Sequence, residues 1–108
     1  METVSFAEFQ KLELRIGTIK NADRIEGSDK LIKLSVVLGE EKRQIIAGIG
    51  KMYAPRQLKE KQIVIVTNLE PRMIMGSESQ GMLLAADSIE GPVLLMPEKE
   101  VASGILVR

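Results

Sequence analysis

Residues that could bind a ligand are concentrated between positions 68 and 86. Apolar runs at 63–66 and 82–86 predict two buried strands, one entering and one leaving this segment. Between the two runs stand polar side chains that can hydrogen-bond to a ligand, and they are Arg72, Ser77, Ser79 and Gln80. Because rigid strands that hold a polar loop are typical of binding sites, the sequence predicts a contact surface here.

The loop at 76–81 has the small and polar residues of a phosphate cradle. It lacks the Lys-Ser/Thr ending and the following helix of a P-loop, so we exclude a nucleotide site. A plain hairpin turn is one interpretation. The other is that its hydroxyls, the Gln80 amide and backbone N–H groups bind phosphates or ribose 2′-hydroxyls. Of Met73, Met75 and Met82, we expect at least two to fill the core, while one exposed thioether could contact a base or ribose.

Enzymatic chemistry has few candidate residues in this chain. The sequence contains no cysteine and no histidine. This composition excludes disulfides, the usual zinc ligands and every Ser-His or Cys-His pair. The acidic pairs Glu40 with Glu41 and Glu98 with Glu100 stand in turn-like sequence without a partner base, and we interpret them as surface charge. We therefore expect no catalytic residue, metal, cofactor or small-molecule substrate.

The charge balance restricts the kind of partner that the chain can bind. Its 15 Lys and Arg residues equal its 15 Asp and Glu residues, which disfavours a purely electrostatic, non-specific nucleic-acid binder. Each basic residue alone is explained as a solvated charge, but those of the first four predicted strands could gather into a phosphate-binding surface. These residues are Arg15, Lys30, Lys33, Lys42, Arg43 and Arg72.

Aromatic residues are too few for a stacking platform. We expect Phe6 and Phe9 to pack a short helix against the barrel, which leaves Tyr53 as the one free aromatic ring. OB-folds that hold single strands stack bases on several aromatic rings. Recognition of a folded RNA by its shape and backbone therefore fits the composition better than base-by-base reading.

The order of predicted elements is that of an all-β fold, a five-stranded OB-fold barrel. Ser5 and Glu8 form a capping box that begins a short N-terminal helix, and Pro55 begins a short helix between the third and fourth strands. The first strand is long, with a bend or bulge at Gly17, and the second and third form a hairpin with a longer loop. Alternation of apolar residues places the strands at 12–25, 31–38, 43–47, 62–68 and 81–86.

We interpret residues 1–108 as a single domain, with the helix and barrel at 1–87 and a C-terminal β extension at 88–108. Apolar segments at 91–97 and 104–108 could pack on their own barrel or on a second subunit, so a two-fold homodimer is expected. No leader pattern and no run of about 18 apolar residues is visible. The expected protein is cytoplasmic and independent of membranes.

Several motifs resemble one known family. They are Leu12-Glu-Leu-Arg-Ile-Gly17, Ser28-Asp-Lys-Leu31, Arg43-Gln-Ile-Ile-Ala-Gly48, Tyr53-Ala-Pro55, Asn68-Leu-Glu-Pro-Arg72 and Ser79-Gln-Gly-Met82. Together they resemble the tRNA-binding OB domain at the C-terminus of methionyl-tRNA synthetases. Similar domains occur in endothelial monocyte-activating polypeptide II and as free-standing tRNA-binding and secretion-chaperone-like proteins. The resemblance spans nearly the whole chain.

The resemblance implies a non-catalytic module that binds tRNA largely by shape, as a free-standing homodimer or as an accessory unit of methionyl-tRNA synthetase. It also implies that the C-terminal strands contribute to the dimer interface. Carried over by motif, the expected RNA contacts are Lys30, Arg43, Asn68, Arg72, Ser79 and Met82.

The chain departs from the family pattern at two places. It has Glu70 and Met73 where the family often has lysines, and Glu26-Gly27 where the family often has His-Pro. The missing lysines and the neutral charge favour an alternative function on the same fold, a peptide-binding export chaperone.

Overall fold

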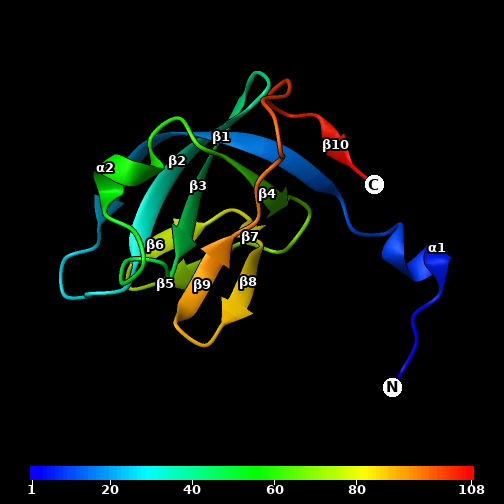
Figure 1. The fold of residues 1–108 in the computed structure, drawn as a ribbon, viewed down its shortest axis with the longest axis horizontal. Coiled ribbons are helices and arrows are strands. Elements are labelled where there is room, and N and C mark those ends of the chain that lie inside the picture. Colours follow the sequence, from blue (N-terminus) through cyan, green and yellow to red (C-terminus); the bar gives the residue numbers. More distant parts are fainter.

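The structure, a computed structural model, describes residues 1–108 and consists mainly of short antiparallel strands (Figure 1). The helices are α1 (Phe6–Phe9) and α2 (Pro55–Leu58). The strands are β1 (Leu14–Arg24), β2 (Ile32–Leu38), β3 (Glu41–Ala47), β4 (Gln62–Val66), β5 (Arg72–Ile74), β6 (Ser77–Ser79), β7 (Met82–Leu83), β8 (Ala85–Ser88), β9 (Gly91–Leu94) and β10 (Leu106–Val107).

The long strand β1 connects the two sides of the main sheet, whose order is β3-β2-β1-β4-β7. Its first half pairs with β4 and its second half with β2, both antiparallel. The predicted bend is present, but the register shift falls between Ile19 and Asn21 rather than at Gly17. Gly17 has a different role, because a Cβ there would lie 2.5 Å from Val36 Cγ1 and 2.8 Å from Ile65 Cδ1.

β2 and β3 form the predicted hairpin, although its turn is tighter than expected. Pairing continues to Leu38 opposite Glu41, so the loop is Gly39-Glu40 alone. Gly39 has a φ of +67°, which glycine adopts without steric cost and which a tight hairpin turn requires. The expectation of a longer loop was wrong because the ladder extends two residues further on the β3 side.

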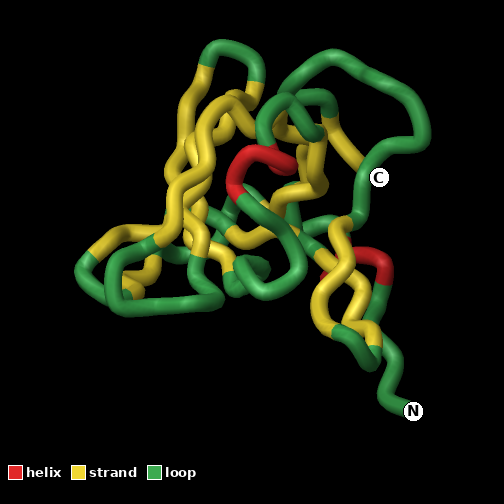
Figure 2. The backbone as a smooth tube through the Cα atoms, turned by 60° about the vertical axis from the view of Figure 1, so that its left-hand side comes forward, coloured by secondary structure: helices red, strands yellow, loops and turns green.

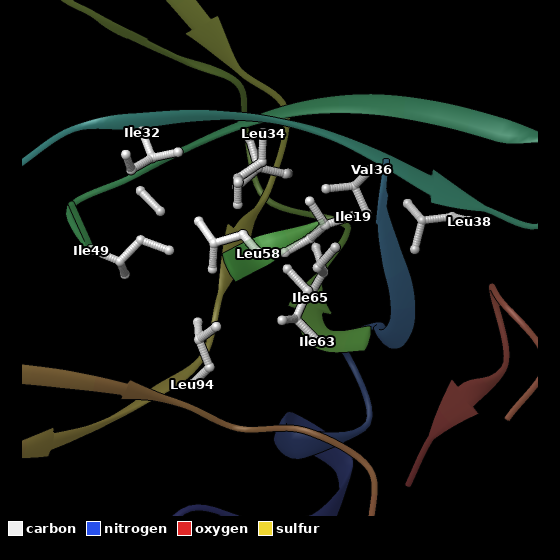
Figure 3. Close-up of a cluster of buried hydrophobic side chains, with 12 residues drawn as sticks. Ile19, Ile32, Leu34, Val36, Leu38, Ile49, Leu58, Ile63, Ile65 and Leu94 are labelled. Atoms are coloured by element: carbon white, nitrogen blue, oxygen red, sulfur yellow. The ribbon is translucent and has the colours of Figure 1, made fainter. Parts of the chain in front are cut away.

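The apolar core fills the barrel interior. Alternate residues of β2 are buried as the period-two pattern predicts, and they are Ile32, Leu34, Val36 and Leu38. Figure 3 shows Leu58 of α2 among the strand side chains, and Leu58 is fully buried. Pro55 begins α2, and the Gln57 side chain accepts a hydrogen bond from the Ala54 N–H at 2.7 Å. The short helix therefore closes one end of the barrel.

The sheet closes on itself between β3 and residues 79–81. The Gln80 N–H donates to the Gln44 carbonyl at 2.7 Å, and the Gln44 N–H donates to the Gln80 side-chain oxygen at 2.9 Å. The Ile46 N–H donates to Ser79 Oγ at 2.9 Å. The fold is thus an all-β, OB-like barrel, as predicted. The predicted fifth strand is divided, since its first part, β7, pairs with β4 and its second part, β8, pairs with β9.

Both segments of the C-terminal extension pair within their own chain. β9 forms a hairpin with β8 and places Leu94 in the core. β10 pairs with the start of β1, opposite Leu14 and Arg15. Between β9 and β10 the chain loops away from the barrel and returns to it (Figure 2). The side chain of Gln62 holds this loop through two hydrogen bonds with Val101, at 2.7 and 3.0 Å.

The N-terminal helix α1 has its predicted cap but not its predicted packing. Ser5 Oγ accepts a hydrogen bond from the Glu8 N–H at 3.1 Å, as the capping box predicts. However, α1 buries no residue, and Phe6 and Phe9 are 72% and 44% exposed. The expectation that both rings pack on the barrel was wrong, because α1 stands apart from it (Figure 1). No helix in the chain has the length and apolar character to cross a membrane.

Gly17→Ala should destabilise the fold by about 1–3 kcal/mol, because the added methyl group would collide with two core side chains from opposite strands. Gly48→Ala is the matched control, since the nearest atoms to a Cβ there are 4.0 Å away. Urea unfolding of both variants measures the difference. Equal midpoints for the two variants would contradict this account of the barrel interior.

Candidate nucleic-acid interface

The polar segment after β4 folds into a small hairpin of its own. β5 pairs with β6, with Arg72 opposite Ser79 and Ile74 opposite Ser77. The turn residues Met75 and Gly76 have φ values of +48° and +82°, as the mirror-image hairpin turns require. The predicted single turn is therefore a two-stranded projection. Met73 and Met75 are 67% and 57% exposed on it and Met82 is 47% exposed, so the expectation that at least two of the three fill the core was wrong.

Arg43 fixes the base of this hairpin. Its Nη1 donates hydrogen bonds to the carbonyls of Thr67 and Gln80, the latter at 3.2 Å. These two residues flank the hairpin segment, so one guanidinium holds both of its ends. The Nε of Arg43 also donates to Glu41 at 2.7 Å. Most of the hydrogen-bonding capacity of Arg43 is therefore used inside the protein.

Two further predicted site residues are also engaged internally. Ser79 is 4% exposed, and its hydroxyl accepts from the Ile46 N–H and donates to the Gly81 carbonyl at 3.0 Å. Asn68 accepts from the Glu13 N–H at 2.8 Å and donates to the Lys11 carbonyl at 2.6 Å. Ser79 thus joins β6 to β3, and Asn68 joins the end of β4 to the segment before β1.

The other three predicted site residues are exposed. Arg72 and Lys30 have no ion-pair partner, and Met82 is 47% exposed. Arg72, Ser79 and Met82 line one small cavity of about 70 Å³ beneath the hairpin. Lys30 lies on the loop between β1 and β2. Gly27 is part of the same loop, and a Cβ added to Gly27 would lie 3.6 Å from Met75 Cε. That loop and the hairpin tip are therefore neighbours, whereas Asn68 lines a different groove beside α1.

Comparison with known proteins supplies the family. The model of a family described as "Putative tRNA binding domain" matches residues 14–106. The chain belongs to this family.

Relatives of this tRNA-binding-domain family include much longer proteins. The chain is 55% identical over 105 residues to a methionine–tRNA ligase of Methanothrix thermoacetophila, covering 97% of this chain and 16% of that protein. It is 50% identical over 108 residues to a methionine–tRNA ligase of Thermococcus kodakarensis, of which it covers 15%. The chain therefore spans about a sixth of the length of these curated relatives.

Solved structures of the same size also match the chain. A MetRS-related protein from Pyrococcus horikoshii superimposes with a TM-score of 0.93 at 38% identity, and each chain is covered completely. The chaperone CsaA from Bacillus anthracis superimposes with a TM-score of 0.91 at 32% identity, covering 99% of this chain and 100% of that one. The fold of this family member is therefore also found in chains that consist of this domain alone.

The sequence did not predict a polar network that lies where the segment before β1 meets the end of β4 in this tRNA-binding-domain protein. Glu13 Oε1 accepts hydrogen bonds from Arg15 Nε at 2.9 Å and from Thr67 Oγ1 at 2.6 Å. Arg15 also donates to the Gly104 carbonyl at 2.7 Å. The signal was present in the sequence, because residues two apart on a strand share a face and Glu13 and Arg15 have opposite charges. The network joins both ends of the chain to β4.

No group of three or more acidic side chains is placed to hold a metal ion. The hydrogen bond from Arg15, followed by that from Thr67, lowers the pKa of Glu13 below its ordinary value.

Glu13→Gln should make the stability of the protein less dependent on pH in the acid range. Because the folded pKa of Glu13 is lowered, its carboxylate contributes stability above its unfolded pKa and loses that contribution as pH falls through the folded pKa. Urea unfolding at neutral pH and at about pH 3 measures the effect, and wild type and variant should converge at the lower pH. A difference that stays constant with pH would contradict the role of the charge.

Proposed function

We propose that this domain binds folded tRNA, recognising its shape and backbone, and that it carries out no catalysis. The observation that carries the proposal is Arg72, an exposed cation without an internal partner on a hairpin whose two ends are held together by Arg43. A guanidinium in this position can donate two parallel hydrogen bonds to one phosphate. Membership of the tRNA-binding-domain family supports the same ligand.

We divide the predicted site residues into two groups by their environment. Arg72, Lys30 and Met82 are exposed and would contact the RNA directly. The polar side-chain atoms of the second group form hydrogen bonds within the protein, and its members would act by positioning the hairpin. This group is Arg43, Asn68 and Ser79. An interface of this kind loses affinity in two ways, by removal of a contact or by loosening of its support.

Recognition by shape and backbone is supported by the state of the aromatic rings. The Tyr53 hydroxyl accepts a hydrogen bond from the Leu94 N–H at 3.1 Å, and Lys61 Nζ lies 5.3 Å from the centre of the ring. Both the hydroxyl and the ring of Tyr53 therefore already contact other residues of the protein. Phe6 and Phe9 lie on α1, away from the hairpin (Figure 1). No row of rings on which successive bases could stack is formed.

The size of the domain relative to its relatives supports an accessory role beside a synthetase. In its methionine–tRNA ligase relatives the matching region is a small part of a larger protein. A second tRNA contact on the same assembly raises overall affinity by making one binding event intramolecular. We therefore propose methionyl-tRNA synthetase as the partner, with this domain supplying the added contact.

We also propose that the free domain is a homodimer built on α1 and β10. The groove between these elements has a volume of about 370 Å³ and is lined by Phe6, Phe9, Leu12 and Leu106 among others. A four-residue helix is too short to be stable without packing, and α1 buries nothing in its own chain. A second copy that covers this groove would bury both phenylalanine rings.

Phe9→Asp should convert a dimer into a monomer, because it places a charge in the apolar groove. We expect the dimer dissociation constant to rise by about tenfold or more, measured by light scattering over a range of protein concentrations. Ile89→Asp is the matched control, since Ile89 is fully exposed at the β8–β9 turn, outside the groove. A wild-type protein that remains monomeric at high concentration would exclude the dimer.

A peptide-binding chaperone is the second candidate function. The match to CsaA from Bacillus anthracis covers that chain completely. The exposed thioethers of Met73, Met75 and Met82 add an adaptable apolar surface of the kind found in proteins that bind varied peptides. The two functions differ in their ligand, so direct binding measurements separate them.

Arg72→Ala should weaken binding of bulk tRNA several-fold at low salt and reduce the slope of log affinity against log salt by about 0.7–0.9. Arg56→Ala is the matched control, because Arg56 is an exposed arginine on α2 without an ion pair. Fluorescence anisotropy with labelled tRNA at several salt concentrations measures both quantities. If the wild-type protein binds an unfolded polypeptide but no tRNA at low salt, peptide binding replaces tRNA binding as the function of the domain.

A further inference from the structure

The small cavity beneath the hairpin lies outside the barrel core. Ile46 of β3 is 7% exposed, but it is not part of the core cluster, which contains its neighbours Ile45 and Ala47. Because successive side chains of a strand point to opposite faces, Ile46 faces outward, where the hairpin covers it. The hydrogen bond from the Ile46 N–H to Ser79 Oγ holds β6 over this position. The cavity of about 70 Å³ is enclosed between the hairpin and β3.

Four apolar side chains form part of the cavity wall. They are Ile46, Leu69, Ile74 and Met82. The volume decides what can enter, since a cavity of about 150 Å³ in a protein interior holds one benzene ring. A space about half that size accepts a short aliphatic group and excludes an aromatic ring or a nucleobase. The flexible thioether of Met82, which is 47% exposed, can adapt to the shape of such a group.

Two opposite charges line the same cavity. Glu70 and Arg72 are exposed, and neither forms an ion pair with the other or with any other residue. Two residues of extended chain span about 7 Å at most, so the two side chains start close together. A guanidinium donates two parallel hydrogen bonds to a carboxylate, and a carboxylate accepts hydrogen bonds from an ammonium group. The cavity therefore offers one partner for an anion, one for a cation and an apolar space beside them.

We propose that this cavity binds a free α-amino acid with a short aliphatic side chain. Arg72 binds the carboxylate of the amino acid and Glu70 binds its ammonium group, while the aliphatic group enters the cavity and contacts Ile46 and Ile74. Among small ligands, a zwitterion with an apolar group uses all three features of the site, whereas inorganic phosphate uses Arg72 alone. The site goes beyond the proposed function. Because Arg72 belongs to both, the amino acid and a tRNA phosphate exclude each other there.

The test titrates the wild-type protein with L-valine in the absence of RNA and follows the backbone amide signals by NMR spectroscopy. Saturable shifts at Ile46, Ile74 and Gly81 are expected. Three analogues each lack one feature, since N-acetyl-L-valine has no ammonium group, L-valinamide has no carboxylate and glycine has no side chain. Each analogue should bind about tenfold or more weakly than L-valine.

The analogues also separate a free amino acid from the ends of a polypeptide. If N-acetyl-L-valine binds as tightly as L-valine, the site holds a polypeptide C-terminus. If L-valinamide binds as tightly, the site holds an N-terminus. Either result overturns the proposal, and so does the absence of saturable shifts with L-valine.

Variants connect the binding to the two charged side chains. Arg72→Gln and Glu70→Gln should each weaken L-valine binding about tenfold or more, because each removes one charged partner of the ligand. Glu90→Gln is the matched control, since Glu90 is an exposed glutamate at the β8–β9 turn, and it should leave the affinity unchanged. Equal effects of Glu70→Gln and Glu90→Gln overturn the site.

Ile46→Val gives a result that misfolding cannot imitate, because it widens the cavity by one methylene group. It should raise the affinity for L-isoleucine relative to L-valine by about fourfold, and an unchanged ratio overturns the site. All these measurements are made without RNA. Failure of L-valine binding therefore leaves the tRNA-binding function standing, and absence of tRNA binding leaves the amino-acid site standing.

Discussion

The barrel depends on one strand that pairs on both of its halves. β1 forms an antiparallel ladder with β4 from Leu14 to Thr18 and with β2 from Thr18 to Arg24. One strand can serve both neighbours only if it bends, and the bulge next to Lys20 supplies the bend while Gly17 keeps a side chain out of the crowded inner face. β10 adds to the same strand. The hairpin and the C-terminal extension are both positioned relative to this one element.

Side chains complete the barrel where regular strand pairing is absent. Ser79 and Gln80 offer their side-chain oxygens to backbone N–H groups of β3, and Arg43 binds carbonyls on both sides of the hairpin. No buried side-chain nitrogen or oxygen lacks a hydrogen-bond partner. A polar group removed from water must be paired, so these closing residues are of necessity polar. This is why the residues with the most ligand-like chemistry in the sequence include several that hold the structure together.

Prediction of the structure from the sequence was most accurate where one physical pattern determined the local structure. Alternation on β2 predicted both the strand and its buried face, and Ser5 with Glu8 predicted the start of α1. Residues 72–79 were harder, because a strand of three residues is shorter than any periodic pattern, and Met75 takes a positive φ that its residue type does not indicate. The exposure of Phe9 was also beyond a sequence reading, since an aromatic residue on a helix has the same pattern whether it packs on its own chain or on another.

The net charge of zero does not describe the electrostatics of the molecule, because some charged side chains form ion pairs and others do not. Arg15 and Arg43 each form an ion pair with a glutamate two residues earlier in the sequence. By contrast, Lys33, Lys42 and Arg72 form none, and all three lie on the hairpin or on the outer face beside it. Paired charges contribute little field at a distance, whereas unpaired cations on one face attract a polyanion at moderate salt. Asp23 beside Lys33 and Lys42, and Glu70 beside Arg72, are unpaired as well, so this side of the molecule carries separate positive charges rather than a continuous basic surface.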